Sequence, residues 1–395
     1  MTNIICASYF DPLGHPLFAD KIASNLSSSS KGGPNITVYG VDIKRPKDIC
    51  KKKFIVIPIN VPLFGRFYKL TTRNFLQDKF GILGRFVFFC IRFWVCSVFY
   101  FKVYRFVSVE ERLIDLEYEP IQSFFAAAFS GIPHYHVMVL HSFPKKYSKN
   151  LKSLYKLISR ALVKFQLKKS RNSYLALMHE RAIAHAKSQG FKDEDLLLAG
   201  WGFDLKPAKT ISRRDAVKNS EPIKVLSFGV LRHDKRIEKL VRLFLSLNDK
   251  RIELNVVGKS FDVDVASLNK EIQNFGSKTR VIIKDKYIDE DEIAGLFNDC
   301  DVTVISHDSS FDSASGPLAL AFEFEKPVLC FSSNFVAELV YKSNFGLVAD
   351  MDSITNKDLT EQIIQLPTIQ HDVSKIKHYE WHAIAKRLIS KPSRI

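Results

Sequence analysis

Short apolar runs alternate with amphipathic segments of helical length along the chain after residue 222. This pattern predicts strands at 224–228, 252–257, 281–283, 301–305 and 327–331, and helices at 237–247, 265–275, 290–297 and 317–324. Neighbouring parallel strands need a long crossover between them, and an intervening helix supplies it. The alternation therefore predicts an α/β fold built on a parallel sheet.

The beginning of the chain shows the same pattern in a weaker form. Apolar runs at 4–8, 36–41, 54–62 and 133–140 are predicted strands, and a helical pattern lies between the first two. A chain of 395 residues has room for two or three domains. We therefore expect two parallel sheets, joined near residues 205–222, where Lys, Pro, Ser and Asn are concentrated.

The formal net charge is +16, and the whole excess lies in the first half of the chain. Residues 1–218 hold 35 Lys and Arg against 16 Asp and Glu, whereas residues 219–395 hold 23 against 26. This division fits a first half that faces an anionic membrane surface and a second half that binds a soluble ligand. No zinc site, recognition helix or basic strand with interleaved aromatic residues is present in the sequence, so no nucleic-acid partner is expected.

Residues 86–101 form an aromatic run that carries a single charge, Arg92, and has basic residues on both sides. Aromatic residues such as Trp94 beside basic flanks are typical of a segment that lies in a membrane interface. A buried core helix explains the same residues equally well, and sixteen residues are close to the lower limit for a membrane span. The sequence leaves these three interpretations open.

A second basic stretch, residues 145–171, holds ten Lys and Arg and no acidic residue. Its cations recur every three or four residues and predict one basic helix face, which includes Lys149, Lys152, Lys156, Arg160 and Lys164. The predicted apolar stripe consists of Leu151, Leu154, Ile158, Leu162 and Phe165. Like charges on one face repel, so we expect contact with an anionic membrane, although a solvated charged face is the simpler alternative.

The six cysteines show no CxxC pair and no metal-ligand spacing, which favours reduced thiols in the core. The first residues lack the basic and apolar regions of a secretory signal. We therefore expect a cytoplasmic protein that lies peripherally at the inner face of the membrane.

Two loops after predicted strands have the composition of an anion site. Ligands of open α/β sheets bind at the carboxyl ends of the strands, where helix N-termini present unpaired N–H groups. Residues 229–236 place cations before a helix and suit a diphosphate, although a basic loop can simply be solvated. Residues 309–316 combine small residues with a helix start, which fits either an anion loop or an ordinary helix cap.

Taken in order, four segments resemble the motifs of a glycosyltransferase of the GT-B fold, close to glycosyltransferase family 4. Gly200-Trp-Gly-Phe-Asp204 is similar to the "nGvD" element of that family, and residues 229–236 resemble its G-x-x-R-x-x-K-G loop. Residues 299–306 resemble its "aDv-x-v-x-PS" strand, and residues 315–328 its following helix and "GkPV" strand. The clear resemblance covers about residues 195–387.

The resemblance implies two Rossmann-like domains that face a central cleft, with a C-terminal helix that crosses back to the first domain. The expected acceptor domain is 1–207, with 379–395 packed on it, and the expected donor domain is 221–378. The co-substrate would be a nucleoside-diphosphate sugar, with no metal and no other cofactor.

The same resemblance implies roles for the matching positions. Arg232 and Lys235 would neutralise the leaving diphosphate, and His141 would contact the transferred sugar or the acceptor, although a lone His can equally be a packing residue. The remaining implied donor contacts are Gly14, Asp312, Ser313, Ser315, Gly316 and Glu338. Ser315 and Gly316 would offer backbone N–H groups, and Glu338 would hold a ribose hydroxyl.

One departure from the family pattern concerns its two glutamates, eight positions apart before the "GkPV" strand. Asp312 and Leu320 occupy those positions here, and Glu325 replaces the glycine of that motif. The expectation is that loop amides around Ser313 and Ser315 take over sugar and phosphate contacts, while Asp312 keeps a hydroxyl contact. Glu323 is the other nearby acid, with a structural role as plausible as a functional one.

The sequence therefore predicts a hexosyltransferase-type enzyme of polysaccharide or glycolipid biosynthesis. It would move a sugar from a nucleoside diphosphate to a lipid-linked or membrane-associated glycan acceptor. Two alternatives stay open, a soluble GT-B enzyme that acts on a small acceptor and a catalytically silent binding protein of the same fold.

Overall fold

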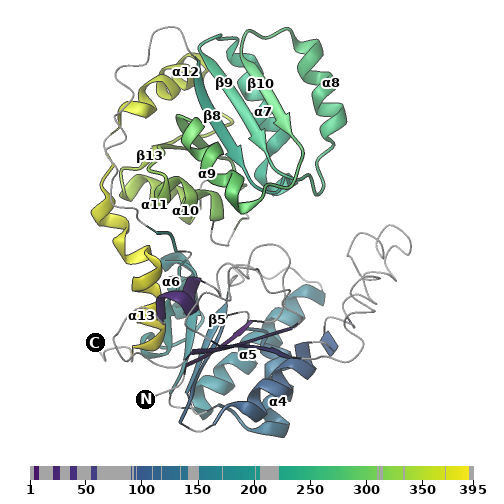
Figure 1. Ribbon diagram of the computed structural model, residues 1–395, viewed down its shortest axis with the longest axis vertical. Helices are drawn as coiled ribbons and strands as arrows, with labels where there is room; N and C mark the ends of the chain where they lie inside the picture. The colour runs from purple at the N-terminus through teal and green to yellow at the C-terminus, as the bar shows by residue number, and fades with distance from the viewer. Residues whose placement is uncertain are drawn as a thin grey trace. The chain divides into compact units, whose positions relative to one another are not determined.

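The chain divides into two compact units in the computed structural model (Figure 1). Unit 1 comprises residues 1–200 and 381–395, and unit 2 comprises residues 201–380. The structure describes residues 4–8, 21–26, 36–41, 55–59, 90, 93–94, 96–108, 110–116, 118–133, 135–140, 151–170, 172–200, 202–204, 222–308, 311, 315–331, 334–369 and 371–390. Both units are α/β, as the sequence predicts.

Unit 2 is built on a six-stranded parallel sheet in the order β10-β9-β8-β11-β12-β13. Its strands are β8 (Ile223–Phe228), β9 (Ile252–Val257), β10 (Arg280–Lys284), β11 (Val302–Ile305), β12 (Val328–Cys330) and β13 (Gly346–Val348). The order reverses between β8 and β11, which is the arrangement of a doubly wound dinucleotide-binding fold. Ligands of such sheets bind beside this point, at the carboxyl ends of the strands.

Helices connect the strands of unit 2 and cover its sheet. They are α7 (Ile237–Leu247), α8 (Val265–Phe275), α9 (Glu290–Asp299), α10 (Gly316–Glu323), α11 (Phe335–Lys342) and α12 (Asn356–Gln365). In α7, buried Leu240, Phe244 and Leu247 recur at helical spacing and pack in one core with strand residues such as Leu254 and Val302. Each of the strands and helices predicted after residue 222 is present within a few residues of its expected bounds.

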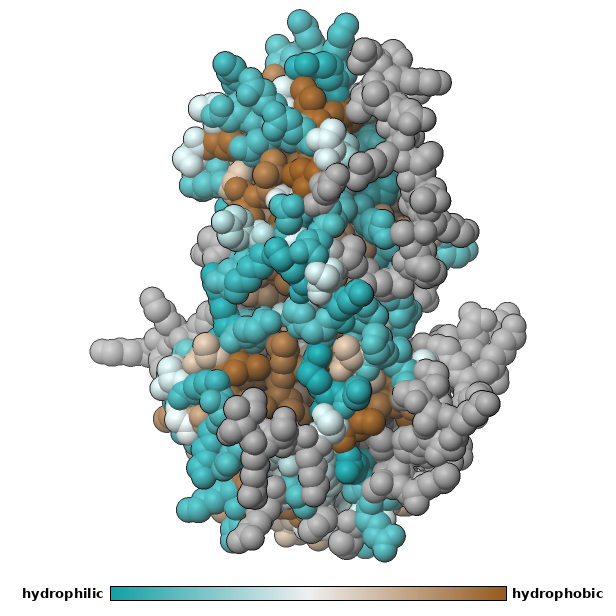
Figure 2. Space-filling model, turned by 90° about the vertical axis from the view of Figure 1, so that its left-hand side faces the viewer, coloured by the Kyte–Doolittle hydropathy of each residue, from teal (hydrophilic) through white to brown (hydrophobic). Residues whose placement is uncertain are grey.

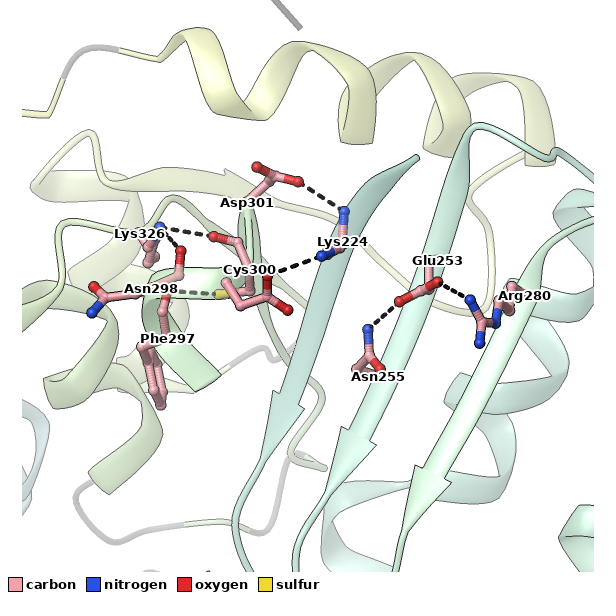
Figure 3. Close-up of polar contacts among 10 residues, drawn as sticks. Lys224, Glu253, Asn255, Arg280, Phe297, Asn298, Cys300, Asp301 and Lys326 are labelled. Atoms are coloured by element: carbon pink, nitrogen blue, oxygen red, sulfur yellow. Dashed lines mark hydrogen bonds and ion pairs between the residues drawn. The ribbon is translucent and has the colours of Figure 1, made fainter. Parts of the chain in front are cut away.

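The amino-terminal edge of this sheet holds its own polar contacts (Figure 3). The buried carboxylate of Glu253 accepts hydrogen bonds from Asn255 (2.8 Å) and Arg280 (3.2 Å). Beside it, the backbone N–H of Lys224 donates to Asp301 over 2.9 Å, and the Lys326 ammonium donates to the Cys300 carbonyl over 2.8 Å. These charges satisfy one another and tie the strand starts together, so their role is structural.

Unit 1 has a seven-stranded parallel sheet in the order β3-β2-β1-β4-β5-β6-β7. The strands are β1 (Ile4–Ser8), β2 (Ile36–Val41), β3 (Ile55–Ile59), β4 (Arg112–Asp115), β5 (Tyr135–Leu140), β6 (Asn172–Leu177) and β7 (Leu196–Leu198). Its labelled helices are α4 (Pro120–Ser130), α5 (Leu151–Lys169), α6 (Glu180–Ser188) and α13 (Trp381–Ile389). Residues 21–26 and 96–106 are also helical.

Helix α13 lies at the end of the chain and yet packs in unit 1. It buries Trp381, Ile384 and Leu388, spaced at three and four, as an amphipathic helix does. The Arg387 guanidinium donates to the Leu198 carbonyl at the end of β7 over 2.9 Å. Figure 2 looks onto the side of the chain where α13 lies, and hydrophilic residues cover most of it, with small hydrophobic groups between them.

The aromatic run near residue 100 contributes to the core of unit 1. Phe99, Tyr100, Val103 and Tyr104 are buried and pack with Leu113 of β4 and Ala126 of α4. Trp94, by contrast, is 41% exposed. Within the described residues, no helix has both the length and the apolar character needed to cross a membrane.

Two details of the sequence interpretation are wrong. The apolar stripe predicted for α5 is not its buried face, because Ile158 and Phe165 are exposed while Val163, Gln166 and Leu167 are buried. Gln166 can lie in the core because its amide is hydrogen-bonded there: its oxygen accepts from the Tyr118 hydroxyl, and its nitrogen donates to the Ser123 hydroxyl. Among the cysteines, Cys90 is an exposed thiol, whereas Cys96, Cys300 and Cys330 are buried thiols that form no disulfide, as expected.

Candidate functional site

Loops that follow β8 and β11 meet at the carboxyl edge of the unit 2 sheet. The β8 loop runs through Gly229 to a short 3-10 helix, His233–Lys235, and then enters α7. The Asp308 N–H donates to the Asp234 carbonyl over 2.8 Å, and the Ser306 hydroxyl donates to the Lys235 carbonyl over 2.5 Å. The basic loop is therefore held against the end of the neighbouring strand at the point where the strand order reverses.

Arg236 fixes the geometry of this junction. It adopts a left-handed backbone conformation (φ 49°), which turns the chain from the 3-10 helix into α7. Its guanidinium donates to the carbonyls of Ser306 (3.0 Å), His307 (3.3 Å) and Phe331. One side chain thus binds the ends of β11 and β12 to the β8 loop, which is a positioning role.

Lys235 lies in a narrow space between the β8 loop and the start of α10. Its ammonium donates to the Phe228 carbonyl over 3.3 Å. Gly229 has a φ of 104°, which favours glycine, and a Cβ placed there would lie 2.8 Å from the Lys235 Nζ and 3.6 Å from the Pro317 Cγ. Burial, with a further contribution from Arg232, lowers the pKa of Lys235 to about 8.

Arg232 is the second cation of the loop and pairs with a single acid. Its guanidinium contacts the Asp234 carboxylate at 2.9 Å, and both side chains are about one third exposed. The Nε of Arg232 is buried and has no hydrogen-bond partner among the described residues. Arg232 and Lys235 together exceed the negative charge that Asp234 supplies, so the loop favours an anion.

His307, at the end of β11, is a buried neighbour of these cations. Burial and then the nearby Lys235, Arg232 and Arg236 lower its pKa to about 3, so the imidazole is neutral near pH 7. Its ring stacks on Phe311, with centroids 3.8 Å apart. The Phe311 carbonyl in turn accepts a hydrogen bond from Asn334, the residue that caps α11, over 3.3 Å.

The third part of the site is the start of α10. Ser315 is buried, and its hydroxyl accepts from the Leu318 N–H over 3.4 Å, so its side chain serves as a helix cap. Gly316 begins the helix and Pro317 follows, which brings this N-terminus to Gly229 of the β8 loop. Glu338 lies half-buried in the first turn of α11.

The structure brings several of the predicted donor residues to one edge of one sheet. Arg232, Lys235, Ser315 and Gly316 come from two loops that lie close together, since a Cβ placed on Gly229 would lie 3.6 Å from the Pro317 Cγ. Six of the predicted residues, Gly14, Arg92, His141, Lys149, Asp312 and Ser313, lie outside the described residues. The side chains of Lys152 and Lys156 are also outside the description, although their backbone belongs to α5.

The predicted membrane residues of unit 1 have different surroundings. Lys164 donates to the Gln189 carbonyl over 2.7 Å and lies 5.1 Å from the centroid of the Phe191 ring. Arg160 donates to the side chain of Gln189. These two cations therefore also fasten α5 to the turn after α6, whereas Trp94 is an exposed side chain of the aromatic run.

Sequence reasoning missed His307, Phe311 and the positioning role of Arg236. Arg236 was included in the basic loop, but nothing in its neighbours distinguishes a cation that faces a ligand from one that binds carbonyls. His307 directly follows the predicted strand at 301–305, so its place at a carboxyl strand end was the one available signal.

The sequence model of the family described as glycosyl transferases group 1 matches residues 208–380. This match, over less than half of the chain, marks a domain that is similar to the glycosyl transferases group 1 family. The domain includes the β8 loop, the end of β11 and the start of α10, and it agrees with the predicted enzyme class, a hexosyltransferase-type glycosyltransferase. A comparison with curated protein sequences finds no match.

Solved structures of similar fold extend over nearly the whole chain. The Anabaena protein Alr3699/HepE in complex with UDP is 13% identical, with a TM-score of 0.63 and 98% coverage of both chains. The lipopolysaccharide outer core galactosyltransferase WaaB in its apo form is 12% identical, with a TM-score of 0.58 and 98% coverage of both. A UDP-forming α,α-trehalose-phosphate synthase from Burkholderia xenovorans is 11% identical, with a TM-score of 0.64 and 98% coverage of both. These likenesses confirm the predicted GT-B fold with two Rossmann-like domains.

Proposed function

We propose that this chain transfers a sugar from a nucleoside-diphosphate sugar to a lipid-linked or membrane-associated glycan. The observation that carries the proposal is the pair of cations, Arg232 and Lys235, in a domain similar to the glycosyl transferases group 1 family. Among the similar structures are a complex with UDP, a galactosyltransferase and a UDP-forming synthase, which supports a nucleotide-sugar donor. The strongly basic first half of the chain supports an acceptor held at an anionic membrane. We further assign the chain to glycosyltransferase family 4, with a Ser-Gly variant of the donor motif.

In this proposal the β8 loop binds the diphosphate. As the bond between the anomeric carbon and the phosphate oxygen breaks, negative charge accumulates on the leaving diphosphate. Lys235 and Arg232 stabilise that charge, and the N–H of Gly316 at the start of α10 adds a hydrogen-bond donor. Asp234 holds the Arg232 guanidinium in place, and Arg236 holds the loop, so the cations are positioned before the donor binds.

His307 contributes by being neutral. A protonated imidazole beside three cations would be costly, and the low pKa of His307 avoids that cost over the physiological pH range. The neutral ring supports the loop through its stack on Phe311. The remaining roles follow the sequence resemblance: His141 contacts the sugar or the acceptor, Glu338 holds a ribose hydroxyl, and Gly14 and the 312–313 loop contact the donor.

A binding measurement tests the donor site. Calorimetric titration of the whole chain with UDP and GDP should give saturable binding that Arg232→Ala and Lys235→Ala each weaken at least about tenfold. Lys239→Ala is the matched control, because Lys239 lies in the next turn but pairs with Asp352. If both variants bind as tightly as the Lys239→Ala control, the proposed donor site is wrong.

Transfer itself is tested with radiolabelled UDP-sugars and GDP-sugars and an extract of bacterial membrane lipids as acceptor. Label should enter the lipid phase and the rate should be the same with and without EDTA, because no metal is proposed. If label enters only water-soluble sugars, the acceptor is a small soluble molecule and the proposed membrane-held acceptor is wrong. Binding without any transfer or donor hydrolysis would indicate a silent binding protein.

A further inference from the structure

Exposed apolar side chains gather on one group of helices in unit 1. Eleven large hydrophobic residues are exposed in the part of the chain that the structure describes, and seven of them lie in residues 93–106, α4 and α5. They are Trp94, Phe106, Phe125, Phe129, Leu157, Ile158 and Phe165. Such clustering differs from the scattered exposed hydrophobic residues that every protein surface carries.

Ring contacts join these helices into one surface. Phe93 meets Phe125 edge to face with centroids 6.2 Å apart, and Phe124 meets Phe165 in the same way at 5.8 Å. Phe124 and Phe125 are neighbours on α4, so the contacts connect residue 93, α4 and α5 in sequence. Figure 1 shows α4 and α5 side by side. We call the exposed residues Trp94, Phe125, Phe129, Leu157, Ile158 and Phe165 the aromatic surface.

The aromatic surface is separate from the core. Helix α4 buries Gln122, Ser123 and Ala126, whereas its exposed face presents Phe125 (48% exposed) and Phe129 (79% exposed). Helix α5 buries Val163 and Leu167 on its other face. Both helices thus have a packed face and an outward apolar face, and folding of unit 1 does not account for the outward one.

The charged residues within the segments that carry this surface are all basic. Residues 93–108, α4 and α5 contain no Asp or Glu, while α5 alone carries six Lys and Arg. Lys168 and Lys169 are exposed, and the Lys169 ammonium lies 5.7 Å from the centroid of the Phe165 ring. Basic residues therefore border the apolar residues, as in helices that lie in a lipid headgroup region.

We propose that the aromatic surface is the docking site for an anionic lipid bilayer. Its rings would enter the headgroup region, and Lys168 and Lys169 would contact lipid phosphates. A second copy of the chain is a poorer occupant, because a two-fold interface would place two acid-free basic surfaces against each other. The inference deepens the proposed function by naming the surface that holds the enzyme near its acceptor, and it rests on that function only for its biological purpose.

Vesicle co-sedimentation of the whole chain tests the proposal without glycosyl transfer. Binding to phosphatidylcholine vesicles that contain phosphatidylglycerol should exceed binding to phosphatidylcholine alone and should weaken with salt. Phe125→Ser with Phe129→Ser should lower the affinity about tenfold or more, and Lys168→Gln about fivefold. The matched controls are Phe275→Ser (49% exposed) and Lys270→Gln, both on α8 of unit 2.

UDP titration and circular dichroism on the same variants separate the two proposals. Retained UDP binding and a folded spectrum together with lost vesicle binding support the docking surface. Failure of the wild type to bind anionic vesicles, or an equal loss with Phe275→Ser, overturns the docking proposal and leaves the donor site untouched. A wild-type dimer that the Phe125 and Phe129 substitutions dissociate would show that the surface joins two copies, which also overturns it.

Discussion

Replacement of Lys235 by Met should make the protein more stable and at the same time remove its affinity for a diphosphate. The pKa of Lys235 falls from 10.5 to about 8 because its ammonium is buried beside Arg232. While Lys235 is protonated in both the folded and the unfolded chain, a shift of this size lowers the unfolding free energy by about 3 kcal/mol. Loss of the hydrogen bond to Phe228 offsets about 1 kcal/mol, so the expected net gain at pH 7 is about 2 kcal/mol.

The sign follows from proton linkage. The unfolded chain holds the Lys235 proton up to about pH 10.5 and the folded chain only up to about 8, so folding becomes more favourable as the pH rises between these values. At pH 7 the folded chain therefore bears the full free-energy cost of the buried Lys235 charge, which Met removes. At pH 10 that cost is below about 1 kcal/mol. The gain from Lys235→Met should shrink with it.

Urea denaturation at pH 7 and pH 10, followed by the fluorescence of the chain, measures this difference. Lys239→Met is the control, since Lys239 is an exposed member of an ion pair with Asp352 and should give no pH-dependent gain. UDP should raise the melting temperature of the wild type and leave that of Lys235→Met unchanged. A loss of stability at pH 7, or a gain of equal size at both pH values, would refute the buried-charge reasoning.

Three further predictions follow from the same site. UDP affinity should fall about tenfold from pH 7 to pH 9 in calorimetric titrations as Lys235 loses its proton, and a flat profile would contradict its role. Between pH 7 and pH 4 the wild type should lose about 3 kcal/mol more unfolding free energy than His307→Leu, because the folded imidazole titrates near pH 3 and the unfolded one near 6.5. Denaturation series at both pH values measure this difference, and equal losses in the two proteins would contradict it. Gly258→Ala should destabilise unit 2 by several kcal/mol, roughly 3, because its Cβ would lie 2.2 Å from the Gly229 carbonyl oxygen; a normal melting temperature would contradict that close approach.

The sequence was most informative where apolar runs end at turn residues. The strands at 223–228 and 252–257 are bounded by charged and glycine residues, so their limits were predictable to within a residue. The buried face of α5 could not be predicted, because this helix is apolar on two sides. Only the tertiary contacts of Gln166 and Val163 decide which side is packed. At the site, the basic loop was visible in the sequence, but the depressed pKa of Lys235 and the neutral state of His307 depend on burial, which residue order does not specify.

The path of the chain through its two units bears on how it can be engineered. Unit 2 is one continuous stretch, and residues near its two ends, Phe203 and Glu380, form a parallel β-bridge with each other. A segment whose entry and exit are adjacent can be excised and replaced as a cassette, because the host sequence on either side needs no rerouting. If unit 2 binds the donor as proposed, swapping residues 201–380 as a block between related chains should exchange donor preference and leave unit 1 of the recipient unchanged.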